Sequence, residues 1–171
     1  MRLILFRHGL AGERDPLRWP EDRDRPLTEK GVERTRQAVR GILRLERRLT
    51  HVLASPLVRA DQTAALLLVT AGLAGDPEHL ESLVPGGSWR KTMARLEAMP
   101  ADTVIALVGH EPDLGKLAGV LLFGAPRPLP LKKAGACSID FEIKATTGAG
   151  TLRWFLAPRA LRQLAGRRKN V

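Results

Sequence analysis

The sequence predicts an α/β domain, a three-layer α/β/α sandwich whose central sheet is mostly parallel. Short apolar runs of strand length alternate with longer segments of helical periodicity along most of the chain. Strands that follow one another through a helix pair in parallel, so the early strands belong to one parallel sheet. Near the end, two alternating segments flank Thr147-Gly148-Ala149-Gly150, which is typical of a hairpin and supplies at least one antiparallel strand.

Length and composition predict a single domain over residues 1–171. A chain of 171 residues, 44% hydrophobic and 27% charged, can bury a core of its own and does not have a disordered composition. It contains no internal repeat and no low-complexity linker that would divide it. The basic stretch Arg167-Arg168-Lys169 is expected to be a frayed, solvated end.

The expected strands are short and rich in β-branched or aliphatic residues. The clearest is Thr-Val-Ile-Ala-Leu-Val, an apolar run typical of a strand buried on both faces. In chain order the expected strands are Leu3–Phe6, His51–Ser55, Thr103–Val108, Cys137–Lys144 and Thr151–Leu156.

The expected helices begin at recognisable capping signals. Thr28 is a suitable N-cap, and Ser55-Pro56 is expected to be an N-cap followed by a first-turn proline. The expected helices cover 28–48, Ser55-Pro56 to about Gly72, 88–99, Asp113–Phe123 and 158–166. Polar or proline-rich loops are expected over 10–27, 78–87 and 124–136.

The charge balance favours an anionic partner. There are 28 Lys and Arg residues against 18 Asp and Glu, a formal net charge of +10. Nucleic acid is a poor candidate partner, because aromatic residues make up 4% of the chain and tyrosine is absent, which leaves few platforms for base stacking. Many of the arginines are expected to lie on solvated helix faces.

Membrane and secreted classes are not favoured. No apolar run approaches the roughly 18 residues of a membrane span, and the N-terminus lacks the three-part pattern of a signal peptide. Cys137 is the one cysteine, so no internal disulfide framework is expected. A reducing, cytoplasmic location is the default expectation, with no membrane partner.

Chemically versatile residues follow three of the expected strands. Arg7-His8-Gly9 follows the first strand, Arg59 lies in the first turn after the second, and Gly109-His110 follows the third. The carboxyl ends of parallel strands meet at one edge of a sheet, where ligands of α/β proteins bind. We therefore expect His8, Arg59 and His110 to share one pocket.

Arginines and histidines around one point repel one another unless an anion joins them. A phosphoryl group is the natural choice, because arginine presents a planar fork to its oxygens. Histidine can act as a nucleophile or as an acid or base. Gly9 can let the backbone approach a ligand closely, and the N-terminus of the helix that carries Arg59 adds to an anion site.

Together these motifs resemble the histidine phosphatase superfamily, with its phosphoglycerate-mutase-like fold. The segments that carry the resemblance are Arg-His-Gly, Ser-Pro-Leu-Val-Arg-Ala-Asp-Gln-Thr at 55–63, and Val-Gly-His at 108–110. The short chain, Arg25-Pro26-Leu27-Thr28-Glu29-Lys30-Gly31 and Leu83-Val84-Pro85-Gly86-Gly87 resemble its SixA-type phosphohistidine phosphatase branch.

The resemblance implies a metal-independent phosphatase without a cofactor. His8 would attack phosphorus and form a covalent phosphohistidine, which water would hydrolyse. Arg7, Arg59 and His110 would bind the phosphoryl oxygens together with the backbone at Gly9. The substrate that the resemblance implies is phosphohistidine on a protein. The segment between Pro56 and Val108 has little room for a large insertion that would cover the substrate, so the pocket should be shallow and open, which suits a protein surface.

A proton donor for the leaving group is less evident. Many members of the superfamily carry an acidic residue on the loop after the second helix, and here that loop contains Glu81. Glu81 is a possible donor, or simply a solvated carboxylate. A weak or missing acid fits phosphohistidine better than a sugar phosphate, because a protonated imidazole leaves readily.

Two other functions stay open from the sequence. One is a small-molecule phosphomonoesterase of the same superfamily, in which Glu81 would matter. The other is a non-catalytic module that binds phosphoproteins or nucleic acid. The sequence leaves open the substrate protein, the oligomeric state and the roles of Arg14, Arg18, Lys132 and Lys133.

Overall fold

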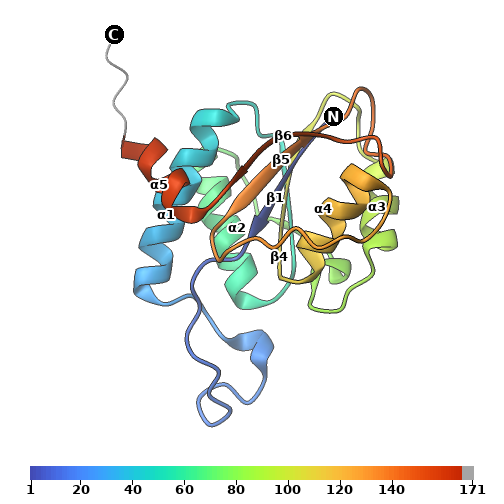
Figure 1. Cartoon of the computed structure of the whole chain (residues 1–171). Helices are drawn as coiled ribbons and strands as arrows, with labels where there is room; N and C mark the ends of the chain where they lie inside the picture. The colour runs from blue at the N-terminus through green and yellow to red at the C-terminus, as the bar shows by residue number, and fades with distance from the viewer. Residues whose placement is uncertain (167–171) are drawn as a thin grey trace.

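The computed structural model describes residues 1–166 and contains one six-stranded sheet flanked by helices (Figure 1). The strand order is β3-β2-β4-β1-β5-β6. The strands are β1 (Arg2–Arg7), β2 (His51–Ala54), β3 (Glu78–His79), β4 (Val104–Gly109), β5 (Ala136–Asp140) and β6 (Thr151–Leu156). The helices are α1 (Glu29–Leu45), α2 (Val58–Ala71), α3 (Trp89–Glu97), α4 (Asp113–Phe123) and α5 (Pro158–Gly166), with short 3-10 helices η1 (Asp22–Asp24) and η2 (Glu81–Leu83).

The three-layer fold class predicted from the sequence is confirmed. Helices α1, α2 and α5 cover one face of the sheet, and α3 and α4 cover the other (Figure 1). Strand β1 shows why both faces are covered: Leu3 and Leu5 join the core under α3 and α4, whereas Ile4 and Phe6 join the core under α1 and α2. Alternate side chains of one strand therefore anchor both helical layers.

The sheet is parallel at its centre and antiparallel at one edge. Strand β4 lies between β1 and β2 and is parallel to both, and β3 extends the parallel part beyond β2. Strand β5 runs antiparallel to β1 and forms the predicted hairpin with β6. The carboxyl ends of β1, β2 and β4 thus meet at one edge of the sheet, as the sequence predicts.

Two strand predictions need correction. Residues 78–79 were expected in a loop, but they pair with Leu53 and Ala54 as the two-residue strand β3. The first hairpin strand was expected to continue to Lys144 and ends at Asp140. Beyond Asp140 the chain still bonds the N-terminus: Phe141 N–H donates to the Met1 carbonyl, and the Met1 ammonium donates to the carbonyls of Phe141 and Ile143.

Three helix boundaries also differ from prediction, and one of them is the end of α3, which is Glu97 instead of residue 99. Helix α1 begins at the predicted cap, where Thr28 Oγ1 accepts a hydrogen bond from Gly31 N–H at 2.9 Å, but it ends at Leu45 instead of residue 48. Helix α2 begins at Val58, and no side chain caps it, so Ser55 is not its N-cap. Its predicted C-terminal end is correct, because Gly72 adopts the left-handed conformation that glycine favours (φ 70°).

No helix within residues 1–166 has the length and apolar character needed to cross a membrane. The predicted frayed end at 167–169 lies outside the described residues.

Candidate active site

The two histidines of the predicted site lie side by side because β1 and β4 are paired in register. Arg7 lies opposite Gly109 in the parallel ladder, and His8 N–H donates to the Gly109 carbonyl at 3.1 Å. The residue directly after β4 is His110, whose ring centroid lies 4.9 Å from that of His8 at an interplanar angle of 51°. The side chains of His8 and His110, which the sequence pattern predicts to lie close together, are therefore neighbours.

Among residues 1–166, one of the two ring nitrogens of His8 has a hydrogen-bond partner. Its side chain is buried (6% exposed), and Nδ1 lies 2.8 Å from the Gly9 carbonyl oxygen. Because a carbonyl only accepts, Nδ1 carries the proton in this bond and Nε2 keeps its lone pair. Burial is the main cause that lowers the pKa of His8 to about 3; His110 and the charges of Arg59 and Arg7 lower it further, and the bond to the Gly9 carbonyl opposes this. The ring is therefore uncharged at neutral pH.

His110 is also buried and uncharged at neutral pH. Burial is the main cause that lowers its pKa to about 3, and the charges of Arg59 and Arg7 lower it further. Its Nε2 is hydrogen-bonded to Ser55 Oγ at 3.0 Å. The sequence pattern missed this contact, because Ser55 followed by proline has the local features of a helix cap. The signal that identifies Ser55 is its place at the end of β2, next to β4.

Arg59 reaches the site from the first turn of α2, as predicted, and is 3% exposed. Its Nη1 donates to the Asp22 carbonyl at 2.8 Å, and its Nη2 donates to Asp22 Oδ2 at 2.9 Å. Burial lowers its pKa, although Asp22 opposes this effect, and the guanidinium remains charged at neutral pH. The sequence pattern did not identify Asp22 as a partner of Arg59, because Asp22 lies in a loop and not at a strand end.

Arg7 is held in a similar way from the other side. Its Nη1 donates to the Leu131 carbonyl at 2.8 Å, and burial lowers its pKa while it stays charged. The Nε–H groups of Arg7 and Arg59 are both buried, and neither donates to an acceptor among the described residues. One N–H group of each arginine is thus left without an acceptor beside two uncharged histidines. Burial of an unpaired donor costs free energy unless an anion accepts from it.

Gly9 connects this turn to two helices. Its N–H donates to Thr63 Oγ1 at 3.1 Å, and that hydroxyl donates to the Arg59 carbonyl at 2.7 Å. A Cβ on Gly9 would overlap Thr35 Oγ1 of α1, so a side chain does not fit here. The backbone at Gly9 therefore packs closely against α1. Contact between Gly9 and a substrate stays a prediction.

Glu111 is a second carboxylate beside the site that the sequence pattern missed. Burial raises its pKa, whereas the bond from Leu131 N–H to its Oε1 (3.2 Å) and the charge of Arg7 lower it, with burial the larger effect. Leu131 therefore accepts from Arg7 and donates to Glu111. The carboxylate anchors the backbone that holds Arg7 in place.

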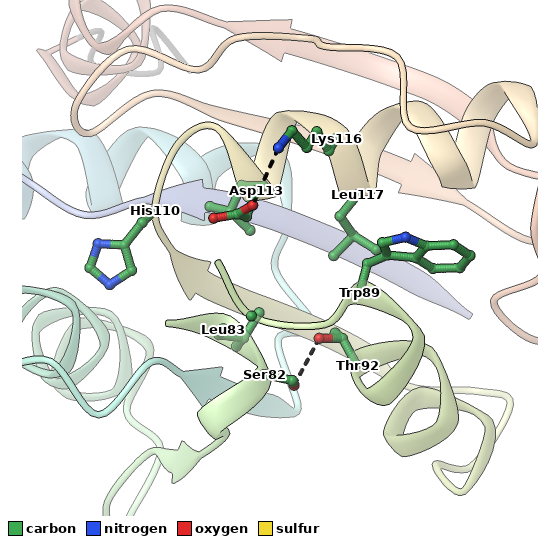
Figure 2. A pocket seen from close by; sticks show the side chains of 10 residues that line it. Ser82, Leu83, Trp89, Thr92, His110, Asp113, Lys116 and Leu117 are labelled. Carbon is green, nitrogen blue, oxygen red and sulfur yellow. Dashed lines mark hydrogen bonds and ion pairs between the residues drawn. The ribbon is translucent and has the colours of Figure 1, made fainter. Parts of the chain in front are cut away.

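A narrow crevice opens beside His110 (Figure 2). Its volume of about 30 Å³ is enough for roughly two water molecules. From the segment around η2 it is lined by Ser82 and Leu83, with Trp89 at the far end. Glu81 begins η2 and is exposed to solvent, so its part as a proton donor stays a prediction.

The remaining basic candidates lie on the surface. The side chains of Arg14 and Arg18 are exposed on the loop after β1, and Arg18 lies over the Trp19 ring at 5.4 Å. Lys132 and Lys133 are exposed as well, in the segment before β5. Within residues 1–166, no group of three or more His, Cys, Asp or Glu side chains is arranged to hold a metal ion.

Comparison with known proteins adds independent evidence. Residues 3–111 match the family model of the histidine phosphatase superfamily (branch 1). An uncharacterised protein of Picosynechococcus is 43% identical over 138 residues, which cover 79% of this chain and 82% of that protein. Phosphohistidine phosphatase SixA of Escherichia coli is 29% identical over 160 residues, covering 92% of this chain and 94% of the relative.

A solved structure of a SixA protein has the same fold as this chain. The protein histidine phosphatase SixA in complex with tungstate superimposes with a TM-score of 0.80 at 27% identity, covering 94% of this chain and 99% of the other. The sequence match, the shared fold and the pair of strand-end histidines agree. The chain is a phosphatase that belongs to the histidine phosphatase superfamily, in its SixA-type branch.

Proposed function

We propose that this protein hydrolyses phosphohistidine on a protein substrate through a covalent phosphohistidine on His8. The observation that carries the proposal is the pair of buried, unpaired Nε–H groups of Arg7 and Arg59 beside two uncharged histidines. Donors of this kind fit a tetrahedral oxyanion. The relative solved with tungstate, an oxyanion, supports this assignment.

In the first step His8 Nε2 attacks the phosphorus of the substrate. A new P–N bond forms to His8 while the P–N bond to the substrate imidazole breaks, and the leaving nitrogen keeps the electron pair. Burial keeps His8 uncharged, so the lone pair is available at neutral pH. Arg7 and Arg59 neutralise the charge that spreads over the equatorial oxygens, and they supply the cations without a metal ion.

In the second step water attacks the phosphorus on His8. The bond to Nε2 breaks, inorganic phosphate leaves with the oxygen of water, and His8 returns to its uncharged form. The Nδ1–H bond to the Gly9 carbonyl holds the ring in one tautomer through both steps. Division of one difficult transfer into two easier transfers is the benefit of covalent catalysis.

The leaving group supports phosphohistidine over an alkyl ester. Substrate imidazole that is protonated on its second nitrogen leaves as a neutral ring, so it needs little help from a general acid. Glu81, the predicted donor, is exposed to solvent, and the crevice beside His110 is lined by its neighbours Ser82 and Leu83. An alkoxide would need a better placed acid.

The test is transfer of labelled phosphate to His8. The enzyme is mixed briefly with a phosphohistidine-bearing protein and, separately, with an aryl phosphate, in the presence of EDTA. We expect acid-labile label on His8 from the protein substrate with continued turnover. His8→Ala should lose the label and lower kcat by about 10³-fold or more, whereas His51→Ala, at a histidine in the first position of β2, should do neither.

Each other outcome has a distinct meaning. Label from the aryl phosphate alone would replace the protein substrate by a small phosphomonoester. Loss of turnover in EDTA would contradict the metal-independent mechanism. Absence of both label and turnover would favour a non-catalytic phosphoprotein-binding module.

We also propose that the protein works in the cytoplasm. Support comes from Cys137, which is buried and unpaired, with its pKa raised by burial to about 12. An inert thiol and no second cysteine suit a reducing compartment. Fractionation of the native host with antibody detection would test this, and recovery from the secreted fraction would contradict it.

A further inference from the structure

Arg59 is held by a single residue of the loop after β1. Asp22, the first residue of η1, accepts from both terminal nitrogens of Arg59: its carbonyl from Nη1 at 2.8 Å and its Oδ2 from Nη2 at 2.9 Å. A guanidinium has five N–H groups in one plane. With its end edge bound to Asp22, Arg59 keeps its side edge, which carries the unpaired Nε–H, for a ligand.

Asp22 is itself fixed from a second direction. Arg25 Nε donates to Asp22 Oδ1 at 3.0 Å, and Arg25 Nη1 donates to the Gly12 carbonyl at 2.8 Å. The two carboxylate oxygens of Asp22 thus bond different arginines, one on the loop and one on α2. Partial burial alone would raise the pKa of Asp22, but the charges of Arg59 and Arg25 lower it below its ordinary value, so the carboxylate stays ionised.

The loop that carries Asp22 is tied to α2 and to its own base. Leu27 N–H donates to Gln62 Oε1 at 2.8 Å, one turn beyond Arg59. Gly12 N–H donates to the Pro26 carbonyl at 3.1 Å, and Ala11 forms an isolated bridge with Leu27. The loop that carries Asp22 is therefore held in place by hydrogen bonds at its base and to α2, which fixes the position of Asp22 relative to Arg59.

We propose that Asp22 is a positioning residue that sets the orientation of the Arg59 guanidinium toward the phosphoryl group. It does not touch the reacting atoms. Its charge-assisted bonds fix the plane of a buried side chain that would otherwise rotate about several torsions, and a fixed plane keeps the Nε–H edge directed at the oxyanion. This inference deepens the proposed function, because it rests on Arg59 as the phosphate clamp.

The first experiment compares three substitutions on one short helix. Asp22→Ala should lower kcat/KM for an aryl phosphate by about 10- to 100-fold, the scale of a misplaced catalytic group. Asp22→Asn keeps a side-chain oxygen for Nη2 but turns its amide NH2 group toward Arg25, so it should recover part of the activity that Asp22→Ala loses. Asp24→Ala is the matched control: it removes a carboxylate from the same 3-10 helix at an exposed position and should leave kcat/KM unchanged.

A second readout separates positioning from damage to the fold. The inhibition constant for tungstate measures how well the intact site holds an oxyanion, regardless of the fraction of enzyme that is active. We expect this constant to rise in Asp22→Ala in proportion to the loss of kcat/KM. An unchanged constant with a lower maximal rate would mean that part of the enzyme is misfolded, and it would overturn the proposal.

A double-mutant cycle identifies the partner through which Asp22 acts. If Asp22 works through Arg59, then Asp22→Ala should cost almost nothing once Arg59 is already alanine. Two losses that multiply would show an independent role and refute the assignment. Transfer of label to His8 is scored separately in each variant, so a failure of the covalent mechanism would be distinguished from a failure of the positioning role.

Discussion

At the residue scale, the site depends on two histidines that are kept uncharged by burial. His8 and His110 both have pKa values lowered to about 3, and both lie near two permanently charged arginines. A positive charge on either ring would face other cations in a medium that screens poorly. The uncharged His8 is therefore both the form that tolerates its surroundings and the form that can attack phosphorus.

The same shifts predict how stability depends on pH. Each folded-state pKa lies below the unfolded value of about 6.5, so between pH 6.5 and 3 the unfolded chain binds more protons and stability falls as pH falls. Each histidine contributes a slope of about 1.4 kcal/mol per pH unit in this window. Replacement of His8 by glutamine should remove one such slope, measured by urea unfolding from pH 7 to pH 4.5.

The control for this prediction is His51→Gln. His51 is partly exposed, bonds Thr50 Oγ1 and lies outside the candidate site, so it provides a matched histidine-to-glutamine change. If the His8→Gln and wild-type slopes coincide, then His8 is not held uncharged. The nucleophile would in that case need a base to deprotonate it at neutral pH.

At the scale of elements, most helices and strands could be predicted from the local sequence pattern. The features that could not be predicted depend on contacts between residues far apart in the sequence. The strand ends with Arg7-His8 and Gly109-His110 could be predicted because apolar runs stop there. Ser55 could not be assigned correctly, because its local pattern is that of a helix cap while its hydroxyl bonds His110, which lies far along the chain. Strand β3 has only two residues, too few for any periodicity.

The same argument explains why Asp22 and Glu111 were missed. A rule that searches strand ends cannot find Asp22, which reaches Arg59 from a loop residue 37 positions away in sequence. Glu111 adjoins His110, but its significance depends on Leu131, which is brought beside it only when the chain folds. The residues proposed to face the phosphoryl group could be named from the sequence, whereas the residues that hold them in place could not.

Packing of the turn at Gly9 gives a prediction at this scale. Gly9→Ala should destabilise the protein by about 1–3 kcal/mol, the range for an overpacked site, because the added Cβ would overlap Thr35 Oγ1 on α1. It should also lower activity, since the turn carries His8. The measurements are urea unfolding and kcat for an aryl phosphate.

The chain offers both a control and a rescue for this change. Gly12→Ala adds the same methyl group where no atom lies within 4 Å, so it should change neither quantity. Thr35 Oγ1 is buried without a hydrogen-bond partner among the described residues, so Thr35→Ala should be tolerated and should restore stability to Gly9→Ala. If the double variant is as unstable as Gly9→Ala, contact with Thr35 is not the cause.

At the scale of the whole molecule, the net charge of +10 acts on the approach of a substrate more than on the chemistry. Charged groups such as Arg34 and Arg40 are exposed on α1, and their field reaches into solvent only as far as salt allows, about 8 Å at physiological ionic strength. Arg7 and Arg59 are different, because they are partly or fully covered by the protein and, in the function proposed above, would act on a bound phosphoryl group at contact distance.

This separation predicts two salt dependences for one enzyme. For an acidic phosphohistidine-bearing protein, kcat/KM should fall by about tenfold or more from low to high ionic strength, because long-range attraction that speeds association is screened. For an aryl phosphate, kcat/KM should change far less, since binding depends on buried arginines. The same decline for both substrates would place the salt effect inside the site, and no decline for the protein would mean that the basic surface does not recruit it.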